Sequence, residues 1–118
     1  MEFIKARNEK VTLNVKSFIL QEDGYFIAYS PALDLSSYGE SENEAVKNFK
    51  GALLTYIQSV TTHQTLFADL KKLGWTNKKY SRKNFVLPSD YDSNKVFENL
   101  GISLDKRDVK EVQLDLAV

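Results

Sequence analysis

The chain of 118 residues contains no cysteine and only one histidine, His63. The missing cysteine excludes disulfide bonds, zinc sites with thiolate ligands and thiol nucleophiles. A single histidine excludes a metal site built from several imidazoles. A histidine general base needs a nucleophile or an orienting acid beside it, and no sequence pattern around His63 supplies one. We therefore expect no catalytic residue, no cofactor and no metal ion.

Long apolar runs and an excess of positive charge are also missing. No apolar run reaches the length of a signal-peptide core or of a membrane-spanning helix. The 16 basic residues equal the 16 acidic residues, whereas a dedicated nucleic-acid or membrane-surface binder normally carries a basic excess. With 42% hydrophobic and 27% charged residues, the composition is that of one globular domain. These observations predict a cytoplasmic protein that binds no membrane.

The neutral total conceals three segments of different charge. Residues 1–69 carry six basic and nine acidic groups, residues 70–89 carry six basic and no acidic groups, and residues 90–118 carry four basic and seven acidic groups. A short basic segment therefore separates two acidic ones.

Aromatic residues are interleaved with the basic ones in the middle segment. Cations that contact phosphates and rings that stack on bases are what single-stranded nucleic-acid binding requires. We favour a solvated loop with a core tryptophan, because short charge runs usually lie on a solvated face. Docking of an acidic protein surface is a third interpretation. The candidate nucleic-acid-binding residues are Lys71, Lys72, Trp75, Lys78, Lys79, Tyr80, Arg82 and Lys83.

The first third of the chain has the pattern of antiparallel strands. Residues 10–20 alternate between apolar and polar side chains, which is typical of a half-buried strand. The turn sequence QEDG follows, and residues 25–30 form an aromatic-rich second strand that Pro31 ends. A third short strand is predicted over residues 35–38, closing on Gly39.

Two helices are predicted next. The sequence SENE, beginning at Ser41, is a capping box, and beyond it apolar residues recur at spacings of three and four. Gly51 inside this helix costs about 1 kcal/mol relative to alanine, so we expect close packing against a neighbour there. A second, shorter helix is predicted over residues 66–73, with Gly74 as its left-handed stop.

The remainder of the chain, residues 76–118, gives weaker patterns. Residues 85–88 are a short extended piece, residues 93–100 are a helical turn or two, and residues 112–118 alternate as a terminal strand. We divide the chain into an α+β domain over residues 1–75 and a C-terminal extension that packs on the same domain or on a partner chain.

The order of elements predicts an α+β fold, in which a helix covers one face of a three-stranded antiparallel meander. A second short helix and a late C-terminal strand complete it. The strand over residues 25–30 offers apolar side chains on both faces, and one helix cannot cover both. The far face is covered either by the second helix and the late strand or by a partner chain. A homodimer is therefore expected.

Acidic residues near the first helix allow an alternative interpretation as a metal site. These residues are Asp34, Glu40, Glu42 and Glu44. We favour helix capping and the helix dipole, because negative charge is stabilising in a first helical turn. The segment DYDSN, residues 90–94, resembles the start of a calcium loop, but Lys95 stands where that loop needs glycine.

The run DGYFIAYSPALDLSSYGESENEAVKNFKGALLTYI, residues 23–57, resembles the HicB-like antitoxin domain. That family shows an aromatic-rich strand, a proline, a short strand ending in glycine and a capped helix with Glu-Ala near its start. The continuation TLFADLKKLGW, residues 65–75, is similar to a subgroup whose second helix ends in leucine-glycine-tryptophan. The resemblance covers most of residues 10–75, and it extends loosely to the C-terminal strand.

The resemblance implies a degenerate RNase H-like β-β-β-α fold without the nuclease acids. Family members bind a small HicA-type toxin, an mRNA interferase, and block its active site. We therefore expect a non-enzymatic, antitoxin-like protein that occludes such a toxin. The alternatives are a nucleic-acid-binding regulator that uses residues 71–85 and a small hydrolase that uses Asp34 and Glu40. Because aromatic anchors tend to carry interface energy, the candidate partner-binding residues are Tyr29, Leu33, Leu35 and Tyr38.

Many family members also repress their own operon through a C-terminal DNA-binding segment. No clear helix-turn-helix or ribbon-helix-helix follows residue 82. A ribbon-helix-helix would require NFVLP as its strand and residues 92–100 and 103–112 as its helices, and the second of these lacks a clean apolar face. DNA binding therefore stays an open alternative, and so does the existence of a cognate toxin, because orphan family members exist.

Overall fold

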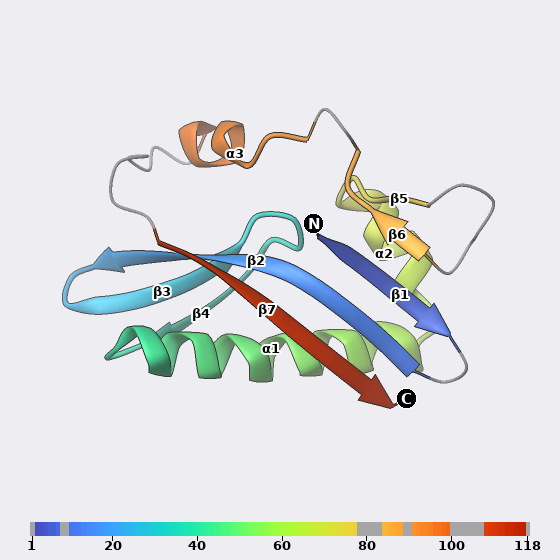
Figure 1. Cartoon of the computed structure of the whole chain (residues 1–118), viewed down its shortest axis with the longest axis horizontal. Coiled ribbons are helices and arrows are strands. Elements are labelled where there is room, and N and C mark those ends of the chain that lie inside the picture. The colour runs from blue at the N-terminus through green and yellow to red at the C-terminus, as the bar shows by residue number, and fades with distance from the viewer. Residues whose placement is uncertain (1, 8–9, 78–83, 89–90, 100–107, 118) are drawn as a thin grey trace.

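The computed structural model describes residues 2–7, 10–77, 84–88, 91–99 and 108–117. Within them the chain has the α+β class that the sequence predicts, with an antiparallel sheet and helices packed on it (Figure 1). The elements are β1 (Phe3–Arg7), β2 (Lys10–Glu22), β3 (Tyr25–Ser30), β4 (Leu35–Gly39), α1 (Glu42–Thr62), α2 (Leu66–Lys72), β5 (Thr76–Asn77), β6 (Asn84–Val86), α3 (Ser93–Asn99) and β7 (Asp108–Ala117).

Strand β2 is the centre of the sheet and is paired on both of its edges. The strand order is β4-β3-β2-β1-β6-β5, with β7 also paired to β2. Strand β7 runs antiparallel to β2 from Lys10 to Ile19. On the opposite edge, β1 pairs with the first part of β2 and β3 pairs with the last part. Between these two partners, the backbone N–H of Lys16 donates to Glu2 Oε1 at 2.7 Å.

The predicted meander of β2, β3 and β4 is present. Its first turn places Asp23 at φ 50° and Gly24 at φ 81°, the left-handed conformations that a tight hairpin turn requires. Strand β1 was not predicted, because its five residues are too few to establish a pattern. The late strand β7 extends the sheet at the edge of β2, and so it does not cover the far face.

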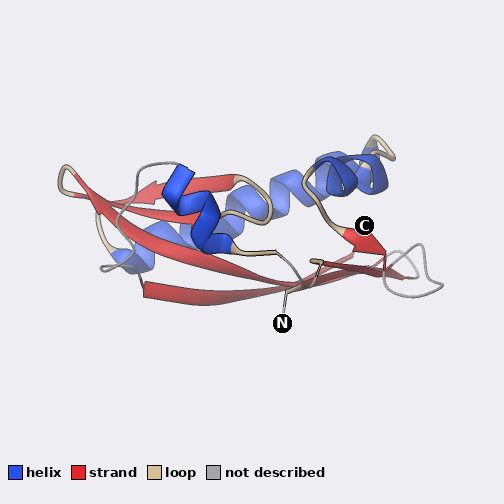
Figure 2. Cartoon of the chain, turned by 90° about the horizontal axis from the view of Figure 1, so that it is seen from above, coloured by secondary structure: helices blue, strands red, loops and turns tan. Residues whose placement is uncertain are grey.

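Helix α1 covers one face of the sheet (Figure 2). It begins as predicted, because the Ser41 hydroxyl accepts the backbone N–H of Glu44 at 3.1 Å. The buried side chains of α1 pack against alternate residues of the strands. Leu70 of α2 and Trp75, which follows α2, belong to the same core. This main core contains Ile4, Val11, Leu13, Val15, Ile19, Ala28, Ala32, Leu33, Ala45, Phe49, Leu53, Ile57, Leu70, Trp75, Phe85 and Val112.

The expected close packing at Gly51 is wrong, and the close approach occurs at Gly39 instead. Gly51 is exposed, and a Cβ atom there would meet nothing within 4 Å. A Cβ atom at Gly39 would overlap the backbone nitrogen of Ala45 and lie 2.8 Å from the carbonyl carbon of Glu44. Gly39 therefore lets the end of β4 contact the first turn of α1.

The ribbon-helix-helix alternative is also wrong. Its second helix would include residues 108–112, and these residues belong to β7, which pairs with β2. The hydrogen-bonding groups of this segment form a sheet ladder, so a helix cannot form there. Residues 103–107 lie outside the described part of the chain.

None of the described helices is long and apolar enough to cross a membrane.

Two glycine substitutions test this account of α1. Gly51→Ala should raise the free energy of unfolding by about 0.5–1 kcal/mol, because alanine is the better helix former and the added methyl group meets no neighbour. Gly39→Ala should lower it by about 1–3 kcal/mol through overpacking. Urea denaturation of both variants beside the wild type measures the two effects. A stabilising Gly39→Ala would contradict the close approach of β4 to α1.

Candidate protein-binding surface

The face of the sheet opposite α1 carries rows of side chains that run across β2, β3 and β4. Residues directly opposite each other in neighbouring strands point to the same face, so the register defines each row. From the middle of the sheet toward the hairpin tip, the rows are Phe18, Tyr29 and Ser36; then Leu20, Ile27 and Tyr38; then Glu22 and Tyr25.

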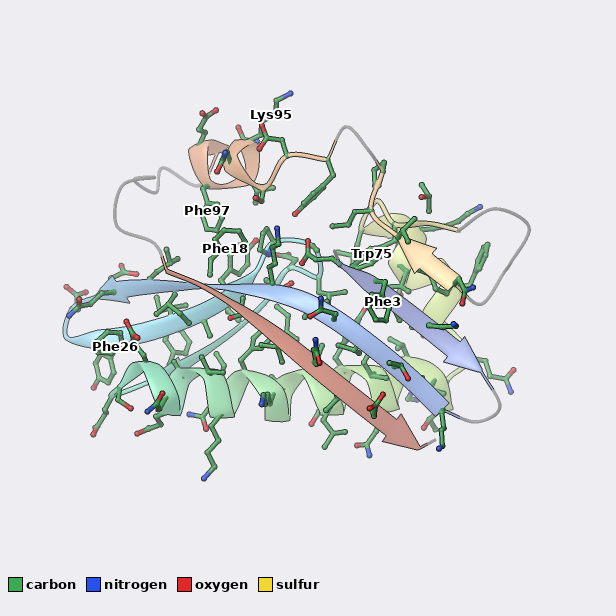
Figure 3. All side chains as sticks on the ribbon, viewed as in Figure 1. Phe3, Phe18, Phe26, Trp75, Lys95 and Phe97 are labelled. Atoms are coloured by element: carbon green, nitrogen blue, oxygen red, sulfur yellow. The ribbon has the colours of Figure 1, made fainter. Side chains whose placement is uncertain are left out.

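Helix α3 covers the first row. Its Phe97 is fully buried, with its ring centroid 4.8 Å from that of Phe18 and 5.9 Å from that of Tyr29, both in edge-to-face geometry (Figure 3). The Asp92 carboxylate accepts the backbone N–H of Asn94 at 2.9 Å, at the start of the helix. A helix of seven residues has little stability of its own, so this aromatic cluster holds α3 on the sheet.

The second and third rows have no such cover within the described residues. We call Leu20, Glu22, Tyr25, Ile27 and Tyr38 the open face. Tyr25 is 53% exposed and Tyr38 is 62% exposed, while Leu20 and Ile27 are half-buried beside them. Among the described large hydrophobic side chains, only Phe67 in α2 is comparably exposed. Two aromatic side chains in contact with solvent on an apolar base are typical of a protein-binding surface.

Negative charge surrounds the open face. Between Ser17 and Val46 the chain has six carboxylates and no lysine or arginine. They lie at the hairpin tip, before and after β4, and in the first turn of α1, and Figure 1 shows the hairpin tip and the start of α1 at the same end of the molecule. These carboxylates are Glu22, Asp23, Asp34, Glu40, Glu42 and Glu44, and all but the half-buried Glu42 are exposed.

The four residues predicted to bind a partner differ in their exposure and in the face of the sheet on which they lie. Tyr38 is exposed on the open face, whereas Tyr29 lies half-buried under Phe97 and donates its hydroxyl hydrogen to Asp34 Oδ1 at 3.0 Å. Leu33 is only 4% exposed, and Leu35 packs against the main core. The sequence-based choice missed Tyr25, although the alternation within β3 places it on the same face as Tyr29.

The predicted nucleic-acid-binding residues are only partly described. Trp75 is 2% exposed, and its Nε1–H donates to the carbonyl oxygen of Ala32 at 2.8 Å, so its ring is not available to stack on a base. Lys71 lies over the Phe67 ring at 4.9 Å, and Lys72 is exposed. The other candidates, Lys78, Lys79, Tyr80, Arg82 and Lys83, lie outside the described residues.

Two of the four acidic residues near α1 serve the start of the helix. Glu42 and Glu44 lie in the first turn of the helix, as the capping interpretation predicts. In the described part of the chain, no three histidine or acidic side chains are grouped to hold a metal ion. His63 lies exposed at the end of α1, where its Nδ1 is 2.7 Å from the carbonyl oxygen of Ser59.

Comparison of the chain with protein-family models, with curated proteins and with solved structures gives no match. Function must therefore be inferred from the surface itself and from the sequence pattern of residues 23–57. The surface combines exposed aromatic rings, an apolar base and surrounding charge of one sign. Exposed aromatic rings on an apolar base are features that protein-binding surfaces share.

The hydrogen bond from the half-buried Tyr29 to Asp34 gives a test of the aromatic cluster. Burial, together with the hydrogen bond to Asp34 and its charge, raises the pKa of Tyr29 from 10.0 to about 12. Because the unfolded state releases this proton first, the stability that Tyr29 contributes should be complete below pH 10 and fall between pH 10 and about 12. The free energy of unfolding of the wild type and of Tyr29→Phe is measured across this range, and the loss between pH 10 and about 12 should be smaller in the variant. Tyr56 and Tyr91, whose pKa values burial also raises, contribute to the loss in both proteins. An equal loss of stability in both proteins would contradict the role of Tyr29.

Proposed function

We propose that the chain is an antitoxin-like protein that binds a small HicA-type mRNA interferase and covers its active site, without catalysing a reaction itself. The observation that carries the proposal is the open face, where Tyr25 and Tyr38 are exposed on the β-β-β-α segment that resembles the HicB-like domain. The proposal places the chain in the cytoplasm, with the mRNA that such a toxin cleaves.

Occlusion requires only a stable surface of suitable shape and charge. The tyrosines would anchor the interface, since large aromatic side chains bury much area with few rotatable bonds. A toxin that binds mRNA needs positive charge around its active site. The carboxylates around the open face complement that charge, so binding of the antitoxin and binding of RNA would exclude each other.

Co-expression with a toxin tests this proposal. The small basic protein encoded beside the gene of this chain should arrest growth when expressed alone, and the chain should restore growth and co-purify with it. Tyr25→Ala combined with Tyr38→Ala should weaken binding at least tenfold, roughly 1.4 kcal/mol or more. Phe67→Ala removes the third exposed aromatic ring and should leave the rescue intact. If no such neighbour exists or co-purifies, the proposal loses its support.

We also propose that two copies of the chain associate through the free edge of β7. Strand β7 pairs with β2 over ten residues without a bulge, and no described strand pairs with its other edge. The Lys16 N–H points to the β1 side of β2, so by alternation Gln113, which lies opposite Asn14, directs its own N–H outward. A long, regular, unpaired edge without proline is a template for further pairing.

A substitution in β7 tests the dimer. Gln113→Pro removes an outward N–H without removing a hydrogen bond to β2, so it should convert a dimer into a folded monomer. Gln113→Thr keeps the N–H and should remain dimeric. Sedimentation analysis of the three proteins measures their mass, and circular dichroism confirms their folding. A wild-type protein that stays monomeric at all accessible concentrations would rule out pairing of copies.

A further inference from the structure

The charge around the open face and the position of its tyrosines restrict the chemistry of the partner. We infer that the open face is a docking site for a cationic protein surface, in which arginine or lysine side chains stack on Tyr25 and Tyr38 and pair with neighbouring carboxylates. The inference rests on the proposed function, because it assumes that the chain acts by binding a protein. It adds which end of the sheet is used and which side chains of the partner are recognised.

Each exposed tyrosine has a carboxylate close by. Glu22 lies directly opposite Tyr25 in the ladder between β2 and β3, and directly opposite side chains on one face have Cβ atoms about 5 Å apart. Glu40, which is exposed, follows Tyr38 by two residues. A cation over either ring is attracted by the π-electrons of the ring and can reach a carboxylate at the same time.

The part of the chain that forms the open face adds no positive charge of its own. The stretch of 30 residues from Ser17 to Val46 contains no lysine or arginine. The bounding residues are Lys16, half-buried in the middle of β2, and Lys47, exposed on α1. On α3, which packs over the first row, Lys95 points away from the strands (Figure 3). Glu22 and Glu40 are exposed, so a cation supplied by another molecule can reach them.

The same charge argues against a second copy as the occupant. Two open faces brought together would oppose their carboxylates, and like charges at an interface cost several kcal/mol. The edge of β7 proposed for the dimer belongs to the opposite side of β2 from β3, so pairing through β7 leaves the open face free. The occupant that the charge favours is a different, basic protein.

Two probes test the inference, and together they distinguish its failure from failure of the proposed function. The first is a poly-arginine peptide, observed by NMR, with poly-glutamate as the matched control. Poly-arginine should shift the signals of Tyr25 and Tyr38 and should lose affinity as salt is added, while poly-glutamate should shift neither. The second is the neighbouring HicA-type toxin, inactivated by substitution of its catalytic histidine, with binding rates measured at several salt concentrations.

Substitutions of the carboxylates and of the tyrosines separate the contribution of charge to binding from that of the aromatic rings. Glu22→Lys combined with Glu40→Lys should lower affinity for both probes by about tenfold or more, mainly through slower association with the toxin. Glu98→Lys, an equally exposed change on α3, should have little effect. Tyr25→Phe with Tyr38→Phe keeps both ring faces and should retain most of the binding that the alanine pair loses. Unchanged circular dichroism and melting temperature establish that these surface variants fold.

Each result either supports or overturns the inference. If the toxin does not bind but poly-arginine binds at the tyrosines, the proposed function fails and the cationic docking site stands. If the toxin binds and the Glu22 and Glu40 variant binds it as well as Glu98→Lys does, the proposed function stands and the inference is wrong. Shifts of the Tyr25 and Tyr38 signals with protein concentration alone would identify a second copy as the occupant and would also overturn it.

Discussion

The pairing of β2 on both of its edges is the constraint on which the surface of this protein depends. Strand β7 occupies one edge, while β1 and β3 share the other. The part of β2 that pairs with β7, Lys10 to Ile19, has no free edge on that side, whereas the last part of the strand pairs with β3 alone. The helices that cover the two faces decide which side chains of the strand are exposed. Helix α1 has 21 residues and spans one face, whereas α3 has seven and covers a single row through Phe97. The open face is the part of the far side that α3 and the other described residues leave uncovered.

The start of α1 adds charge to this arrangement. Gly39 brings the end of β4 against Ala45, so the first turn of the helix lies near the end of the strand that carries Tyr38. Helix starts favour carboxylates because of the exposed N–H groups and the dipole, which accounts for Glu42 and Glu44. It does not account for Glu22 or Glu40, which lie outside the helix. Helix capping and surface charge therefore coincide at one end of the molecule, where Glu22 and Glu40 have no part in the start of the helix.

Local signals in the sequence predict the fold better than they predict the surface. The period of two in β2, the Asp-Gly turn and the Ser41 cap each depend on a few adjacent residues, and each is present in the structure. The pairing of β1 with β6 and that of β7 with β2 join distant parts of the chain, and no local pattern encodes them. The burial of Leu33 and Leu35 has the same origin. Leu35 faces the core because of the register of β3 with β4, and Leu33 is buried in the turn between these strands, so residue type alone cannot supply either position.

Net charge is a weak basis for excluding a charged partner in this protein. Except for Asp34, which lies in the turn between β3 and β4, the six carboxylates gather around the hairpin end of the sheet. Lys71 and Lys72 lie at the end of α2, on the opposite side of the molecule (Figure 1). With a longest extent of 42 Å, the two ends are several screening lengths apart at physiological salt, where the Debye length is about 8 Å. An approaching molecule therefore experiences one end at a time. The acidic end repels a nucleic acid and attracts a basic protein, so a neutral total and a strongly charged binding face are compatible.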